Sequence, residues 1–182
     1  MTTDLDAVRL DAVVQRVVDS LSGDWLLVGG ALVALWLDAR RVTEDVDLVG
    51  LAGTGADRLS LLRLAADLGL PVEALNSAAD YFVHQIPDWT DQIVVFRTGA
   101  AGRVYRPTPT LFLLLKLRRL SGRDLEDCLE LLRRCRQDGL DVDTRRVGSE
   151  LAALTPAPDS ALMARRQRLQ AAIEELPGTA PR

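Results

Sequence analysis

The sequence predicts an α/β or α+β protein with a sheet domain over residues 1–106, a helical segment over 107–176 and a short tail over 177–182. In the first part, short apolar runs alternate with amphipathic stretches, and glycine, proline and charged residues separate them. From Pro107 onward the pattern changes to helical spacing. A length of 182 residues suits one ordinary domain, or one domain with a small helical appendage.

The elements of the sheet domain follow from this pattern in chain order. Leucines and valines at helical spacing predict a first helix over 5–21, which Ser22 and Gly23 end. The next segments are predicted as a strand over 25–28, a helix over 31–37, a strand over 46–51 and a helix over 56–68. Less regular strands are expected over 72–75, 81–86, 92–97 and 103–105. The single histidine, His84, falls in one of these strands, and we interpret it as a packed residue rather than a catalytic one.

The helical segment contains four predicted helices, which glycine, serine and proline residues separate. They cover 109–120, 124–138, 144–154 and 159–176. Both cysteines, Cys128 and Cys135, lie on the second of these helices. Seven residues of helix place their Cα atoms about 10 Å apart, which is too far for a disulfide. We interpret them as small buried apolar residues.

Composition and charge exclude several classes of protein. A net charge of -4 argues against binding of nucleic acid by bulk charge, although it leaves a local basic patch open. Such a patch is one interpretation of the arginines in the last helices, and a solvated face is the interpretation that their helical spacing favours: Arg145, Arg146, Arg165, Arg166 and Arg168. No apolar run approaches the roughly 20 residues of a membrane span. The acidic stretch from Met1 to Asp6 lacks the features of a signal peptide, so we expect a cytoplasmic protein that binds no membrane.

The most informative stretch joins a strand, a pair of glycines and two aspartates. Gly29 and Gly30 follow the predicted strand directly, where they let the backbone approach a ligand and where a helix start offers N–H groups to a phosphate. Asp45 and Asp47 are two residues apart at the start of the next strand, so both carboxylates are predicted on one face. Two convergent carboxylates suit Mg²⁺, which bridges nucleotide phosphates. The alternative interpretation is an edge strand that begins with solvated charges.

A second observation concerns Lys116, the one lysine among 22 basic residues. It lies in a leucine-rich helix, so its ammonium group needs an anion or a path to water. Further along, Asp124 could serve as a helix cap that pairs with Arg123, and Asp127 could lie on a solvated helix face.

The order of these residues resembles the minimal nucleotidyltransferases of the polymerase-beta-like superfamily. Their signature is an apolar strand, Gly-Gly or Gly-Ser, a short helix, and then Asp-x-Asp or Asp-x-Glu; here the residues are Val28-Gly29-Gly30 and Asp45-Val46-Asp47. The segment from Pro109 to Leu117, followed by Arg123-Asp124-Leu125-Glu126-Asp127, is similar to the Lys-Leu … Arg-x-Asp-Leu-x-Asp segment of the AbiEii-type toxin nucleotidyltransferases. Together these segments anchor residues 25–132.

The resemblance implies a mixed nucleotidyltransferase-type sheet flanked by helices, and a helical segment on its C-terminal side. It also implies site residues. Gly29 and Gly30 would hold the triphosphate, and Asp45 and Asp47 would bind Mg²⁺. On the helical segment, Lys116 and Arg123 would reach a nucleotide phosphate, and Asp124 or the candidate catalytic residue Asp127 would complete the site.

Three features depart from the family pattern. Fourteen residues separate Gly30 from Asp45, which is slightly longer than usual. Position 30 is glycine instead of the serine that contacts phosphate in many relatives, so that hydroxyl is absent unless Thr43 supplies it. A third carboxylate, for which Asp91 and Glu73 are candidates, has no clear strand context.

By resemblance, the predicted activity is Mg²⁺-dependent transfer of NMP from an NTP to a hydroxyl acceptor. The acceptor would be an RNA 3′ end, such as that of tRNA, or a protein side chain. One role that the resemblance implies for this chain is that of the toxin in a toxin–antitoxin pair, with an antitoxin as its partner. The alternative is a non-catalytic regulatory or partner-binding protein on a degenerate nucleotidyltransferase fold.

Overall fold

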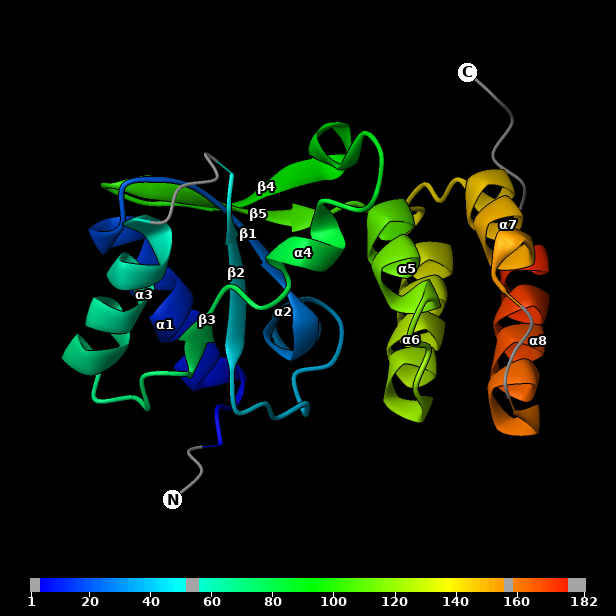
Figure 1. Cartoon of the computed structure of the whole chain (residues 1–182), viewed down its shortest axis with the longest axis horizontal. Helices are drawn as coiled ribbons and strands as arrows, with labels where there is room; N and C mark the ends of the chain where they lie inside the picture. The colour runs from blue at the N-terminus through cyan, green and yellow to red at the C-terminus, as the bar shows by residue number, and fades with distance from the viewer. Residues whose placement is uncertain (1–3, 52–55, 156–158, 177–182) are drawn as a thin grey trace. The chain divides into compact units, whose positions relative to one another are not determined.

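A computed structural model of the chain describes residues 4–51, 56–155 and 159–176, and it divides into two compact units (Figure 1). The first unit ends at Pro107 and the second begins at Thr108. The tail expected over 177–182 lies outside the described residues.

The first unit, called here the sheet unit, combines strands and helices. Its elements are α1 (Ala7–Ser20), β1 (Gly23–Val28), α2 (Gly29–Trp36), β2 (Val46–Gly50), α3 (Ala56–Asp67), β3 (Leu75–Asn76), α4 (Asp80–Val83), the 3₁₀ helix η1 (Trp89–Gln92), β4 (Ile93–Thr98) and β5 (Gly102–Pro107). Helix α1 begins where the Asp6 side chain accepts a hydrogen bond from the N–H of Arg9, which satisfies one of the donors left free at a helix start.

The strands form one mixed sheet in the order β3-β2-β1-β5-β4. β1 runs antiparallel to β2 and parallel to β5, β2 runs parallel to β3, and β4 and β5 form an antiparallel hairpin. Helices α1 and α2 pack against each other and against the strands, and α3 packs against β3. Burial of the residues over 25–28 explains why the central strand, β1, contains a continuous apolar run. The structure confirms the predicted α+β class and the mixed sheet.

The prediction of a strand over 81–86 was wrong, because this stretch belongs to the short helix α4 and to the turn that follows it. The apolar run misled the prediction: Tyr81 and Phe82 are exposed and only Val83 of α4 is buried. His84 is exposed too, and its ring lies edge-on to Trp89. Its Nδ1 atom lies 2.9 Å from the carbonyl oxygen of Asp80. The interpretation of His84 as a packed residue was therefore also wrong.

The second unit, called here the helical unit, consists of four helices in its described part. They are α5 (Pro109–Leu117), α6 (Gly122–Asp138), α7 (Thr144–Ala153) and α8 (Ser160–Glu174). The side chain of the N-cap residue accepts a backbone hydrogen bond at each helix start: Thr108, Ser121, Asp143 and Asp159. Across the described ranges, no helix is both long enough and apolar enough to cross a membrane.

The helical unit buries both cysteines and partly covers two of the arginines. Cys128 and Cys135 are free thiols and both are buried, as predicted. Burial raises the pKa of the Cys128 thiol, so it stays protonated. Arg165 and Arg166 are half-buried and donate to the carbonyl oxygens of Leu120 and Thr155, at 2.7 and 2.6 Å. These two arginines are therefore only partly solvated, as is Arg146, whereas Arg145 and Arg168 are exposed.

Candidate functional site

The first glycine of the pair lies against one of the two predicted aspartates. Val28, the last residue of β1, pairs with Asp47 of β2, and Gly29 begins α2 with a φ of +70°. A Cβ atom on Gly29 would lie 2.2 Å from the Oδ2 atom of Asp47, which is closer than any two such atoms approach. Glycine is required here for two reasons, because the backbone is left-handed and because the Asp47 carboxylate fills the space.

The second glycine has a different neighbour. A Cβ atom on Gly30 would lie 2.7 Å from the Oγ1 atom of Thr43. The same hydroxyl donates a hydrogen bond to the Oδ1 atom of Asp45 over 3.0 Å. The structure therefore brings together five residues of the sheet unit that the sequence analysis singled out: Gly29, Gly30, Thr43, Asp45 and Asp47. Side chains of the protein itself occupy the space over both glycines.

The two aspartates differ in their setting. Asp47 lies within β2 and is half-buried, whereas Asp45 precedes the strand and is exposed. The strand alternation used to predict one common face therefore applies to Asp47 but not to Asp45. Both side chains keep access to water, and carboxylate oxygens are the donors that Mg²⁺ prefers, so these residues fit a bound Mg²⁺.

Neither of the predicted third carboxylates lies beside this pair in the sheet. Glu73 is exposed in the turn before β3, and Asp91 lies in η1. The residue of β3 that pairs with Asp47 is Asn76, which carries an amide. Within the described ranges, no three His, Cys, Asp or Glu side chains gather in a way that could hold a metal.

A hollow in the sheet unit lies away from the glycine pair. It has a volume of about 590 Å³ and is lined by Gly23, Asp24, Leu51, Ala101, Gly102 and Arg103. These residues surround the beginning of β1, whereas Gly29 and Gly30 follow its end. Arg103 already binds Asp24 through two hydrogen bonds of 2.9 and 3.0 Å. We therefore place the candidate site on the aspartate and glycine geometry instead of on this hollow.

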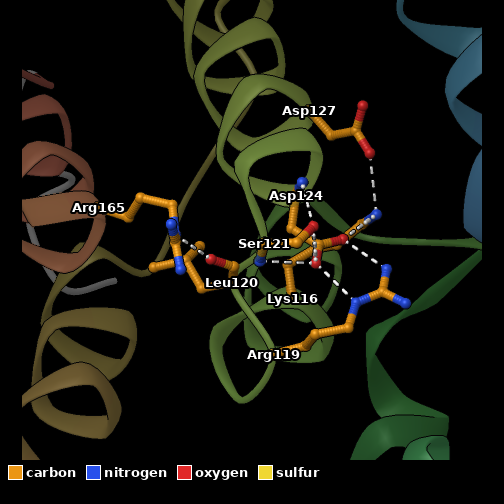
Figure 2. Close-up of polar contacts among 7 residues, drawn as sticks. All are labelled: Lys116, Arg119, Leu120, Ser121, Asp124, Asp127 and Arg165. Atoms are coloured by element: carbon orange, nitrogen blue, oxygen red, sulfur yellow. Dashed lines mark hydrogen bonds and ion pairs between the residues drawn. The ribbon is translucent and has the colours of Figure 1, made fainter. Parts of the chain in front are cut away.

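Three of the four predicted residues of the helical unit, Lys116, Asp124 and Asp127, meet near the turn between α5 and α6 (Figure 2). The Nζ atom of Lys116 donates to the Oδ1 atom of Asp124 and to the Oδ2 atom of Asp127, both over 2.9 Å. The side chains of Lys116, Asp124 and Asp127 are 12%, 1% and 3% exposed. Asp127 therefore does not lie on a solvated helix face, and the anion that the Lys116 ammonium needs comes from its own unit. Arg123 is exposed at the beginning of α6.

Asp124 also accepts hydrogen bonds from two residues that the sequence analysis missed (Figure 2). Arg119 donates through Nε and Nη2 over 2.7 and 2.8 Å. Ser121 donates from its N–H and its hydroxyl, and accepts from the Asp124 N–H, which forms a capping box. The Ser-x-x-Asp spacing before an apolar run is a signal that identifies this cap. Asp124 is thus the buried third residue of the helix in a capping box whose N-cap is Ser121, and it forms ion pairs with Lys116 and Arg119 instead of the expected pair with Arg123.

These contacts determine the acidity of Asp124. Burial by itself would raise the pKa of this carboxyl, but the hydrogen bonds from Arg119, the charge and hydrogen bond of Lys116, and the Ser121 hydroxyl outweigh it. The pKa of Asp124 consequently lies well below its usual 3.8.

This low pKa predicts a pH dependence of stability. Because the pKa of Asp124 is lower in the folded than in the unfolded chain, its contribution is complete above the unfolded value of 3.8 and is lost as the pH falls below it. We expect the free energy of unfolding to fall between about pH 5 and pH 2 more steeply for the wild type than for Asp124→Asn. Urea unfolding followed by far-UV circular dichroism at several pH values measures this, and equal slopes for the two proteins would contradict it.

The predicted site residues thus form two groups, one in each unit. Gly29, Gly30, Thr43, Asp45 and Asp47 belong to the sheet unit, and Lys116, Arg123, Asp124 and Asp127 belong to the helical unit. Comparisons of the chain with protein-family models, with curated proteins and with solved structures found no match.

Proposed function

We propose that this protein is a Mg²⁺-dependent nucleotidyltransferase that moves NMP from an NTP to a hydroxyl acceptor. The observation that supports this most is the contact between Asp47 and Gly29, at the junction of β1 and α2. It places a carboxylate beside the start of a helix whose N-cap, Val28, makes no side-chain hydrogen bond. N–H groups at such a helix start suit phosphate, and the neighbouring carboxylates suit the Mg²⁺ that accompanies a triphosphate.

The proposed reaction is a single displacement at phosphorus. The acceptor hydroxyl oxygen bonds to the α-phosphorus, the bond from that phosphorus to the bridging oxygen of the pyrophosphate breaks, and the hydroxyl proton passes to water. Mg²⁺ held by Asp45 and Asp47 would supply charge neutralisation on the phosphates. The chain's own contribution is to direct Asp47 at the glycine turn and to hold Asp45 through Thr43.

The role of Lys116 toward a nucleotide phosphate stays a prediction. Its ammonium is held between two buried carboxylates, which reduce its freedom to reach another anion. Arg123, which is exposed, is the second cation proposed for nucleotide phosphates. The acceptor, an RNA 3′ end such as that of tRNA or a protein side chain, and an antitoxin partner belong to the same proposal.

A transfer assay tests the proposed function. The purified chain is incubated with Mg²⁺, each α-labelled NTP in turn, total RNA and cell lysate. We expect label to pass to RNA or to a protein with one or more of the NTPs, and we expect chelation of Mg²⁺ with EDTA to abolish the transfer. Absence of transfer to every acceptor would overturn the proposal.

One observation favours the non-catalytic alternative, a regulatory or partner-binding protein on this fold. Asp124 and Asp127 already neutralise Lys116, which leaves less charge for a phosphate. Titration calorimetry with NTP separates the two functions. The enzyme is expected to bind NTP far more weakly in EDTA, because the metal bridges the carboxylates and phosphates. Binding that is the same with and without Mg²⁺ would favour the alternative.

A further inference from the structure

We propose that Thr43 is a positioning residue, whose hydroxyl fixes the Asp45 carboxylate of the proposed metal-binding pair and locks it to the glycine turn. This inference rests on the proposed function. It revises the expectation that the Thr43 hydroxyl replaces a phosphate-binding serine, because in the structure this hydroxyl donates a hydrogen bond to Asp45.

Two hydrogen bonds to Leu5 hold the backbone of Thr43 in place. Its N–H donates to the carbonyl oxygen of Leu5 over 3.2 Å, and its own carbonyl oxygen accepts from the N–H of Leu5 over 2.8 Å. Leu5 is only 1% exposed, so the core of the sheet unit anchors this pair. The loop from α2 to β2 is therefore tied down two residues before Asp45.

The side chain of Thr43 then makes two contacts with a single atom. Oγ1 lies 3.0 Å from the Oδ1 atom of Asp45, which is a hydrogen-bond distance. The same Oγ1 lies over Gly30, where it would be 2.7 Å from an added Cβ atom. Gly30 does not have a positive φ, so an alanine would fit its backbone, and it is the Thr43 hydroxyl that excludes the side chain.

These contacts matter for Asp45 because it is exposed and lies outside the strand. An exposed aspartate samples several rotamers, and this freedom must be lost when it binds a cation. The Thr43 hydroxyl bonds the Oδ1 atom of Asp45, so it restricts the Asp45 side chain before any metal binds. The Oδ2 atom of Asp45 is then the oxygen proposed to bind the metal. Outer contacts of this kind change metal affinity by about tenfold or more in metalloproteins.

Binding of Mn²⁺ alone, followed by electron paramagnetic resonance on the full chain, tests the proposal. Mn²⁺ accepts the same carboxylate oxygens as Mg²⁺. Thr43→Val keeps the branched shape and removes the hydroxyl, and it is expected to raise the dissociation constant for Mn²⁺ roughly tenfold. Thr43→Ser, which keeps the hydroxyl, should bind Mn²⁺ within about twofold of the wild type. Thr98→Val, an exposed threonine at the end of β4, is the matched control and should leave Mn²⁺ binding unchanged.

A second measurement tests the contact with Gly30 without any metal. Gly30→Ala should lower the midpoint of urea unfolding in the wild type, and roughly half or less of this shift should remain in a Thr43→Ala background. Thr43→Ala removes Oγ1 and leaves only the Thr43 Cβ atom, 3.1 Å from the added Cβ of residue 30. Equal shifts in the two backgrounds would overturn the coupling of Thr43 to the turn.

The outcomes of the Mn²⁺ measurement separate this proposal from the proposed function. If the wild type binds Mn²⁺, Asp47→Ala abolishes the binding and Thr43→Val binds like the wild type, then the positioning role is overturned and the metal pair stands. Weakening by Thr43→Val and Thr43→Ser alike would also overturn it, because the serine keeps the hydroxyl. If the wild type does not bind Mn²⁺, or if Asp45→Ala and Asp47→Ala bind as well as the wild type, both proposals fail.

Discussion

Replacing Asp124 by alanine is expected to lower the free energy of unfolding by about 3–5 kcal/mol. The variant leaves the ammonium of Lys116, whose side chain is 12% exposed, with Asp127 but without Asp124 as a carboxylate partner. It also removes the capping box of α6, which by itself contributes about 1 kcal/mol. Loss of the contact with Arg119 adds little, because the Arg119 side chain is 77% exposed.

Urea unfolding followed by far-UV circular dichroism and by tryptophan fluorescence measures this loss. All three tryptophans belong to the sheet unit, so fluorescence reports that unit, whereas circular dichroism also reports α5 to α8. Asp138→Ala is the matched control on the same helix, since Asp138 pairs with Arg134 and both side chains are exposed. It should change the free energy by no more than about 0.5 kcal/mol. Equal effects of the two variants would show that the buried cluster does not stabilise the helical unit.

The second large effect concerns activity. Replacing Asp47 by alanine is expected to lower NMP transfer by about a thousandfold, because it removes a ligand of the ion that neutralises the phosphates. The variant should remain folded, since it removes a carboxylate that is only half-buried. The transfer assay described above measures the rate, and unfolding curves show whether the fold is intact. A folded Asp47→Ala protein with wild-type transfer would contradict the proposed role.

A glycine variant provides an independent check on the same contact. Gly29→Ala keeps both aspartates but puts a Cβ atom where the Asp47 carboxylate lies, so we expect it to reduce transfer as strongly as Asp47→Ala. It should also lower the free energy of unfolding by about 1–2 kcal/mol, because the backbone at this position is left-handed. Gly69→Ala is the matched control, because Gly69 has a similar φ of +64° and open space around its Cα atom. That control should share the backbone cost and leave transfer unchanged.

Much of the fold was predictable because local patterns determine local structure. Four of the five strands and the helices of the helical unit lie close to the predicted ranges, since glycines, prolines and caps mark their ends in the sequence itself. The segment over 81–86 failed for the same local reason. Its apolar residues read as a strand, and only the packing of Val83, with Tyr81 and Phe82 left outside, makes it a helix and a turn.

The candidate site was predictable in its members but not in their contacts. The spacing of Asp45 and Asp47 behind Gly29 and Gly30 singles out these residues from the sequence. It does not show that Thr43 fills the space over Gly30, because that contact depends on how the loop before β2 returns to α2.

For Lys116, the sequence by itself determined that an ammonium on a leucine-rich helix needs an anion or water. Only the tertiary structure decided that Asp124 and Asp127 supply the anion, and that Asp127 is buried instead of solvated. The physical reason is the same in both units. Backbone hydrogen bonding within a helix is local and follows the pattern of residues, whereas the partner of a charged side chain depends on which segments the packing of the core brings next to it.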